Sequence, residues 1–402
     1  MYLRKRISKG KEYWSINETF RDNEGKVKQK LIRNLGNAEK ALEELKLDSS
    51  YSQFYFQLLS YINSQSNVLT NATCKVIQGN SLLLSKLLED IKVNTCVTSP
   101  PYYAQRDYGV PGTYWPPVSY IPMAGLQEIH IPEWTGCLGL EPTPEMYVGH
   151  MVLIFREVWK VLREDGTLWL NLGDTYCSTA PGTLGDKHFI QEFSNGAAEA
   201  RRKYRPKTPK GLKPKDLMGI PWRVAFALQA DGWYFRIDNV WNKPNPTPES
   251  VKDRTTRAHE YIFLLSKSQR YYYNSDAILE PYTTKPPKKL RDKHAEGYQA
   301  DYPRGERFSP GERDYYSRGG KNKRSVWTIP VKKPKSTNYA TFPPDIARTC
   351  ILAGCPEDGI VLDVFGGTGT TAEVAKDLQR SCICVELKEE SAKIAYERVC
   401  GE

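Results

Sequence analysis

The pattern of apolar and polar positions divides the 402-residue chain into a short β-rich start and a long region of alternating strand and helix patterns. In residues 1–36, β-forming and polar residues alternate around turns at 8–10 and 22–25, which predicts a small three-stranded meander. Residues 37–73 carry spaced Ala and Leu positions, and they predict a helical connector to the main region.

From Cys74 onward, short apolar runs alternate with helix-period segments, which is the pattern of an α/β fold. Two further β-rich runs, 234–241 and 260–266, are expected to pair as an antiparallel hairpin at one edge of the sheet. The other predicted strands are 74–78, 94–98, 167–172, 359–364 and 381–385, and the predicted helices are 81–91, 144–162, 221–229, 344–353 and 371–378.

Charge adds a candidate partner to this outline. The chain carries a formal net charge of +10, and a basic balance favours a polyanion such as nucleic acid. Residues 201–215 hold eight Lys/Arg and no acid, and residues 284–335 hold fifteen Lys/Arg against six acids, with aromatic residues interleaved. Both segments are candidates to bind a phosphate backbone, and solvated linkers are the alternative. The candidate DNA-binding residues are Arg201, Arg202, Lys203, Arg205, Lys321, Lys323 and Arg324.

Membrane and metal chemistry are not indicated. No apolar run approaches the roughly 20 residues that span a bilayer, and no apolar signal core follows the basic start, so we expect a cytoplasmic protein. The nine cysteines lack zinc-site spacing, and we expect no metal.

A glycine-rich loop follows the strand predicted at 359–364. Gly366, Gly367 and Gly369 allow a ligand to approach the backbone closely at the start of a helix, and Glu386 ends the next strand, where a carboxylate can accept hydrogen bonds from ribose hydroxyls. Taken alone, this loop suits a nicotinamide, a flavin or S-adenosylmethionine equally. It is not a P-loop, because no Gly-Lys-Ser/Thr follows.

The segment Ser99-Pro100-Pro101-Tyr102 stands at the end of a predicted strand, 264 positions before Asp363. Proline fixes the backbone, so the Pro100 carbonyl can point rigidly at a substrate beside the aromatic ring of Tyr102. The Ser99 hydroxyl and the Pro100 carbonyl could together accept both N–H bonds of an exocyclic amine. An ordinary turn at a strand end is the alternative for these four residues alone.

Together the two motifs resemble those of the DNA amino-methyltransferases that modify cytosine N4 or adenine N6, in the permuted arrangement of the β group. The resemblance extends through most of residues 74–390. It includes, in collinear order, residues 139–144 (GLEPTP), 168–176 (LWLNLGDTY), 241–246 (WNKPNP), 257–260 (RAHE) and 323–327 (KRSVW). It implies a seven-stranded, circularly permuted methyltransferase sheet, with a catalytic half at 74–283, a target-recognition region at 284–335 and a cofactor-binding half at 336–402.

The resemblance also implies roles for individual residues. Ser99, Pro100, Pro101 and Tyr102 would hold a base flipped out of duplex DNA, because a stacked base cannot reach the site. The residues implied for S-adenosylmethionine are Asp363, Phe365, Gly366, Gly367, Thr368, Gly369, Thr370, Thr371, Glu386, Phe342, Pro343 and Asn80. Asn80 stands where the family usually has Asp, and it could still offer a side-chain carbonyl.

Ser rather than Asp at position 99 favours cytosine N4 as the acceptor, with adenine N6 as the alternative. Methylation at cytosine C5 is excluded, because the chain has no Pro-Cys dipeptide to supply a thiol nucleophile. An RNA or protein-amide methyltransferase, an inactive DNA-binding module and an NAD-dependent oxidoreductase fit the motif set less well.

The first 36 residues resemble the β-rich N-terminal segment of some insertion-sequence transposases, which implies a DNA-facing accessory module; a solvated edge sheet is the alternative. The expected partners are double-stranded DNA and a cognate restriction endonuclease, and the expected assembly is a monomer or homodimer.

Overall fold

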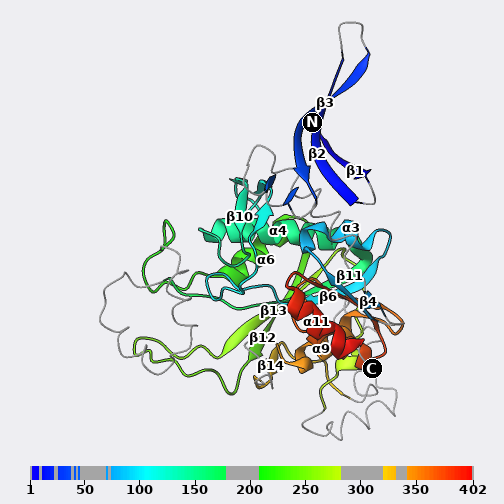
Figure 1. Cartoon of the computed structure of the whole chain (residues 1–402). Coiled ribbons are helices and arrows are strands. Elements are labelled where there is room, and N and C mark those ends of the chain that lie inside the picture. Colours follow the sequence, from blue (N-terminus) through cyan, green and yellow to red (C-terminus); the bar gives the residue numbers. More distant parts are fainter. Residues whose placement is uncertain are drawn as a thin grey trace, which may run out of the picture.

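The computed structural model describes residues 2–8, 11–21, 26–37, 40–41, 44–45, 69–70, 74–177, 208–281, 320–331 and 342–400. Within these ranges, the main body is a large mixed sheet with helices on both faces, and a separate small sheet at the N-terminus projects away from it (Figure 1). The predicted α/β class is therefore confirmed.

The main sheet contains the seven predicted strands in the order β12-β13-β11-β6-β15-β16-β5, and short strands β14 and β4 extend its two edges. The five strands from β11 to β5 run parallel, whereas β13 runs antiparallel to both β11 and β12, as the predicted hairpin requires. The strands are β4 (Leu69–Thr70), β5 (Cys74–Gln78), β6 (Val93–Thr98), β11 (Leu162–Leu172), β12 (Tyr234–Asn242), β13 (His259–Ser266), β14 (Val326–Thr328), β15 (Ile360–Asp363) and β16 (Ser381–Glu386).

Helices cover both faces of this sheet and close two hydrophobic cores. On one face lie α3 (Leu84–Leu88), α4 (Pro144–Val161) and α6 (Ile220–Ala230), and on the other lie α9 (Pro344–Gly354), α10 (Thr370–Asp377) and α11 (Glu389–Val399) (Figure 1). Central strands read as apolar runs because both of their faces are buried, as in the Ser381–Glu386 strand.

The sheet changes its crossover side between β6 and β15. The helix α4 that follows β6 packs in one core, whereas α10, which follows β15, packs in the other. Such a switch point opens a crevice at the carboxyl ends of the two strands, which is where open α/β sheets bind ligands.

Two small two-stranded sheets between β6 and α4 were not predicted. They pair β7 (Thr113–Trp115) with β10 (Trp134–Gly136) and β8 (Val118–Tyr120) with β9 (Ile129–Ile131). Three-residue strands are too short to show a period of two. The helix predicted at 81–91 is present as the 3-10 turn η2 (Ser81–Leu83) followed by α3. The C-terminal helix α11 and the 3-10 turn η4 (Asp276–Ile278) were missed.

The N-terminal sheet is the predicted antiparallel meander of β1 (Tyr2–Ser8), β2 (Lys11–Arg21) and β3 (Val27–Gly36). Its buried side chains include Trp14, Ile16 and Leu35. Of the predicted helical connector at 37–73, residues 40–41 and 44–45 are helical, 69–70 form β4, and most of the remainder lies outside the described residues. Among the described helices, none has the length and apolar character needed to cross a membrane.

Candidate active site

The two sequence motifs meet although 264 positions separate them. Strands β6 and β15 are parallel neighbours, with Thr95 opposite Val361 and Cys96 opposite Leu362. At their carboxyl ends, the Thr98 hydroxyl donates a 2.7 Å hydrogen bond to the Asp363 carboxylate. The start of the Ser99–Tyr102 turn and the start of the glycine loop are thus held together by a buried contact.

Asp363 holds the glycine loop from beneath. Its side chain is buried and also accepts hydrogen bonds from the Thr371 hydroxyl at 2.7 Å and the Phe365 N–H at 3.0 Å. Burial raises the pKa of this carboxyl, and the three hydrogen bonds work against that rise. Because its hydrogen bonds go to the loop and to β6, Asp363 stabilises the conformation of the site.

Each of the three glycines in this loop is required for a different structural reason. A Cβ on Gly366 would stand 1.9 Å from the Cys384 sulfur, so only glycine fits against β16. Gly367 and Gly369 have φ values of +51° and +83°, a region that glycine adopts without strain. Gly369 is the N-cap of α10, so the loop leads into a helix N-terminus.

Glu386, at the end of β16, is fixed by the backbone around it. One carboxylate oxygen accepts a 2.8 Å hydrogen bond from the Gly367 N–H, and the other accepts a 2.8 Å bond from the Lys388 N–H. Burial raises the pKa of Glu386, and the two backbone bonds counteract that shift. Each oxygen keeps further acceptor capacity, as a carboxylate has about four lone-pair sites.

Asn80 is positioned differently from the sequence expectation. Its side-chain carbonyl, expected to face the ligand, accepts a 3.0 Å hydrogen bond from the Leu82 N–H and caps the turn η2. Its amide nitrogen is buried and has no hydrogen-bond partner among the described residues. Because a backbone N–H can only donate, this contact fixes the amide orientation, and Asn80 presents a donor to the cleft.

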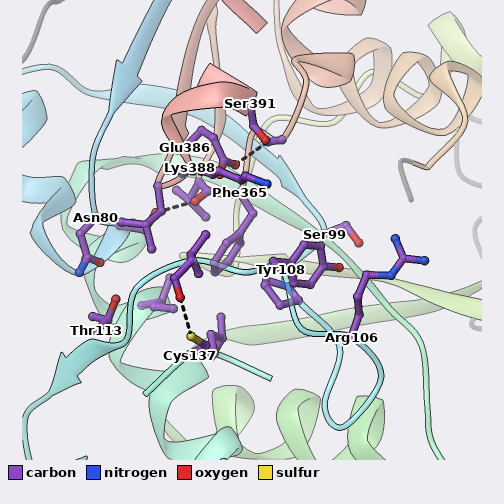
Figure 2. A pocket seen from close by; sticks show the side chains of 18 of the residues that line it. Asn80, Ser99, Arg106, Tyr108, Thr113, Cys137, Phe365, Glu386, Lys388 and Ser391 are labelled. Carbon is purple, nitrogen blue, oxygen red and sulfur yellow. Dashed lines mark hydrogen bonds between the residues drawn. The ribbon is translucent and has the colours of Figure 1, made fainter. Parts of the chain in front are cut away.

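A cleft connects these groups to the Ser-Pro-Pro-Tyr turn. Figure 2 shows Glu386, Lys388 and Asn80 on one side, Ser99, Tyr108 and Arg106 on another, and Phe365 between Glu386 and Ser99 in this view. Its lining residues are Asn80, Ser81, Ser99, Pro101, Arg106, Tyr108, Val110, Thr113, Trp115, Cys137, Leu138, Ile154, Val364, Phe365, Gly367, Thr368, Glu386, Leu387, Lys388 and Ser391.

Other predicted cofactor residues do not line this cleft. Thr371 donates to Asp363 from within the core, and the Thr370 hydroxyl lies 3.3 Å from an Arg398 guanidinium nitrogen. Phe342 packs against the core that contains α9, and Pro343 is the N-cap of that helix. These four residues, together with Asp363, Gly366 and Gly369, contact the protein that surrounds the loop.

The Ser-Pro-Pro-Tyr turn is fixed by hydrogen bonds on both sides. The Tyr147 hydroxyl donates a 2.9 Å bond to the Pro101 carbonyl, and Pro100 is buried. The Tyr102 hydroxyl reaches Asn171 at 2.9 Å and Glu260 at 2.8 Å. Ser99 and Pro101 face the cleft, whereas the Tyr102 hydroxyl is tied into the sheet behind it.

Three polar residues beside this turn were not predicted as site residues. Asn171 comes from β11, Glu260 from β13, and Lys243 follows β12; Lys243 forms an ion pair with Glu260 and stands 4.3 Å from the centroid of the Trp241 ring. All three lie in the collinear family segments at 168–176, 241–246 and 257–260. A polar residue inside an otherwise apolar strand, as at Asn171, was the available signal.

The predicted DNA-binding residues divide into two groups. Arg201, Arg202, Lys203 and Arg205 lie outside the described residues, as do residues 284–319 of the predicted target-recognition region. Lys321 pairs through its backbone with Glu280, the Arg324 guanidinium lies 2.8 Å from the Glu280 carboxylate, and Lys323 lies over the Trp327 ring. The Arg324 side chain remains 72% exposed.

Comparison with known proteins decides the family. The family model described as DNA methylase, covering N6- and N4-specific enzymes, matches residues 93–397. The chain belongs to the N4/N6 DNA methyltransferase family. It is 41% identical over 327 residues to the type II methyltransferase M.SmaI of Serratia marcescens, covering 81% of this chain and 91% of the relative. It is 38% identical to M.Cfr9I of Citrobacter freundii, covering 81% and 88%.

Among solved structures, the PvuII DNA methyltransferase (cytosine-N4-specific) is 17% identical with a TM-score of 0.47, covering 82% of this chain and 87% of that one. A second family model, the N-terminal domain of IS1634 family transposases, matches residues 3–49 of the methyltransferase. The small N-terminal sheet is thus similar to a transposase N-terminal domain, as the sequence resemblance indicated.

The cofactor of this methyltransferase is S-adenosylmethionine, and the cleft suits it on two observations. Glu386 offers acceptor oxygens at the end of β16, where ribose hydroxyls can donate. The unpartnered Asn80 amino group offers a buried donor to a nucleobase acceptor. When bound, the cofactor supplies an electrophilic methyl group.

Proposed function

We propose that this DNA methyltransferase transfers a methyl group to the exocyclic N4 amine of cytosine at a specific site in duplex DNA. The observation that carries the proposal is the joining of the Ser-Pro-Pro-Tyr turn to the glycine loop at the ends of β6 and β15. Ser99 and Pro101 line the same cleft as Phe365, Gly367 and Glu386, so amine and methyl donor can share one space.

The turn would activate a poor nucleophile by geometry. The lone pair of an exocyclic amine is delocalised into the base ring, and accepting both N–H bonds, at the Ser99 hydroxyl and the Pro100 carbonyl, favours a pyramidal nitrogen with its lone pair free. Ser99 can serve as acceptor because its own proton can go to the Tyr102 hydroxyl oxygen, 3.3 Å away. Positioning of this kind supplies a large part of the barrier reduction in transfer reactions.

In the cofactor half, we assign the methionine moiety to the loop from Phe365 to Thr371 and the ribose to Glu386. Phe365, Gly367 and Thr368 face the cleft. Asp363, Gly366 and Gly369 maintain the shape of the loop. We assign the adenine to the neighbourhood of Asn80.

Cytosine N4 is proposed over adenine N6 because residue 99 is a neutral serine. The pattern of cytosine-N4 enzymes resembles this one, whereas an aspartate at this position is typical of the adenine enzymes.

The target cytosine must flip out of the DNA helix, which costs a few kcal/mol, and stacking on Tyr102 offsets part of that cost. We propose that the basic segments 201–215 and 284–335 hold the phosphates meanwhile, and that the N-terminal sheet is an accessory DNA-facing module. Because the relatives are type II methyltransferases, we also propose a cognate restriction endonuclease. Such a pair would act on DNA in the prokaryotic cytoplasm or nucleoid.

The test is expression in a host that lacks DNA methylation, followed by nucleoside analysis of its genomic DNA. We expect N4-methylcytosine at one recurring sequence. N6-methyladenine instead would refute the cytosine assignment and retain the amine site, and no modified base would refute the proposed function.

A further inference from the structure

The amine site continues behind Tyr102 into a chain of polar groups that ends on a carboxylate. The Ser99 hydroxyl lies 3.3 Å from the Tyr102 hydroxyl, which in turn donates a 2.8 Å hydrogen bond to Glu260. Asn171 lies beside the chain: its side-chain oxygen is 2.9 Å from the Tyr102 hydroxyl oxygen, and its amide nitrogen donates to Glu260 at 3.3 Å. Strands β6, β11 and β13 are consecutive neighbours in the sheet, which is why these residues meet.

Methyl transfer to an exocyclic amine requires a group that takes up a proton. Forming the N–C bond leaves the nitrogen positively charged with one proton to lose. Ser99, the side chain nearest to that proton in the proposed site, is not itself a base at neutral pH. We propose that Glu260 receives the proton, through the Ser99 and Tyr102 hydroxyls acting as a relay.

The relay balances proton by proton. The amine proton passes to the Ser99 oxygen, the Ser99 proton passes to the Tyr102 oxygen, and the Tyr102 proton passes to Glu260, whose carboxylate becomes a carboxylic acid. The Glu260 side chain is 15% exposed, so the proton can leave to solvent. Both hydroxyls end the step neutral.

Neighbouring acids are less suited to this role. Asp174 accepts three backbone hydrogen bonds, from Thr175, Gly219 and Ile220, and so fixes the start of α6. Asp363 is occupied by its own three bonds to the cofactor loop and β6. Of the carboxylates in the described part of the chain, Glu260 is the one that accepts a hydrogen bond from the Tyr102 hydroxyl, at 2.8 Å.

Tyr102 is suited to pass a proton and unsuited to keep a charge. Its pKa lies well above the ordinary tyrosine value, first because of burial and second because of the negative charge of Glu260. Asn171 cannot accept a proton as an amide, but its contacts with Tyr102, Glu260 and the Tyr261 carbonyl hold the relay in place.

The charge on Glu260 is compensated locally. Lys243, which follows β12, forms an ion pair with it, and its side chain is 18% exposed. Within the described residues, His259 on β13 interacts electrostatically with Glu260, Lys243 and Arg257, and Tyr102 faces Glu260 from the turn. A glutamine at position 260 would keep the shape of the side chain and lose the proton-accepting charge.

This inference rests on the proposed exocyclic-amine methyl transfer, and its test compares Glu260→Gln and Tyr102→Phe in single-turnover assays on target duplex across pH. Tyr102→Phe keeps the aromatic ring and removes only the relaying hydroxyl. We expect each variant to lower the transfer rate by about 10²–10⁴-fold, the range for removal of a proton-transfer group. The double variant should be no slower than the slower single variant, because both interrupt one path.

Two readouts separate proton acceptance from a structural role. The wild-type rate should fall toward acid pH, and this acid limb should be absent in Glu260→Gln. Duplex binding in the presence of S-adenosylhomocysteine, measured by fluorescence anisotropy, should not change. The matched control is Glu157→Gln, since Glu157 likewise accepts from a hydroxyl, that of Ser85, and pairs with a lysine, Lys160.

A Glu260→Gln rate near that of wild type would overturn the inference, as would a slowed variant that keeps the wild-type acid limb. Failure of the wild-type chain to methylate any DNA would instead refute the proposed function, so the two failures are distinguishable.

Discussion

Gly173 offers a way to disturb the amine site without changing a polar group. This glycine follows β11, and a Cβ added to it would stand 2.5 Å from one carbon of the Tyr102 ring and 2.8 Å from the next. Carbon atoms in contact prefer about 3.5–4.0 Å, so in Gly173→Ala the ring must move by about 1 Å.

That movement has two measurable consequences. The Tyr102 hydroxyl loses its contacts with Asn171 and Glu260, now 2.9 and 2.8 Å long, because a shift of about 1 Å exceeds hydrogen-bond range. We expect turnover to fall by about 10²-fold, the typical effect of a 1 Å misplacement, and the free energy of unfolding to fall by about 1–3 kcal/mol from overpacking. Cofactor affinity should stay unchanged, because the glycine loop is untouched.

The matched control is Gly166→Ala, within β11 itself. Its Cβ would stand 2.5 Å from the Leu162 side chain, an equal clash placed away from Tyr102. Single-turnover methylation, denaturant unfolding and calorimetric binding of S-adenosylmethionine should be measured on both variants. Equal turnover in the two variants, at equal loss of stability, would refute the view that the position of the Tyr102 ring controls transfer.

Three further predictions concern the cofactor and the DNA. Asn80→Asp keeps the cap on Leu82 and removes the donor, so we expect calorimetry to show about tenfold weaker S-adenosylmethionine binding, as for one lost hydrogen bond; unchanged affinity would contradict the proposed adenine contact. The pKa of Glu386 is raised, so its carboxylate should gain a proton at a pH above the ordinary glutamate value of 4.5, and cofactor affinity should fall as it does. Glu386→Gln should show no such pH dependence; an equal pH dependence in both proteins would show that Glu386 does not bind the cofactor. Replacing Arg201, Arg202 and Lys203 by neutral residues should weaken DNA binding and reduce its salt slope by about one per lost phosphate contact, whereas an identical slope would show that this run is only solvated.

The sequence predicted the main sheet because its signals were local. Strands such as 94–98 and 359–364 are short runs rich in β-branched or apolar residues, followed within two residues by Pro100 and Gly366. Helices such as 144–162 begin with a capping Thr and a Pro, so the positions of these elements needed no knowledge of distant residues. The two small sheets within 113–136 left no comparable signal, because each strand has only three residues.

The site was predicted in part, for a related reason. Ser99, Phe365 and Glu386 stand at strand ends, and parallel neighbours bring strand ends together. Glu260 was missed because its contact with Tyr102 depends on strand order across the sheet, with β11 between β6 and β13. The orientation of Asn80 was missed because the Leu82 N–H competes for its carbonyl, a contact that exists only once the turn has formed.

The central claim is that the Ser-Pro-Pro-Tyr turn holds the exocyclic amine of a flipped cytosine against the cofactor cleft. The most direct measurement is base-resolved sequencing of DNA from a methylation-free host that expresses either the wild-type chain or Tyr102→Ala, with S-adenosylmethionine binding measured on both purified proteins. We predict N4-methylcytosine at one sequence for the wild type, and no modification with normal cofactor binding for Tyr102→Ala. Full methylation by Tyr102→Ala would contradict the account.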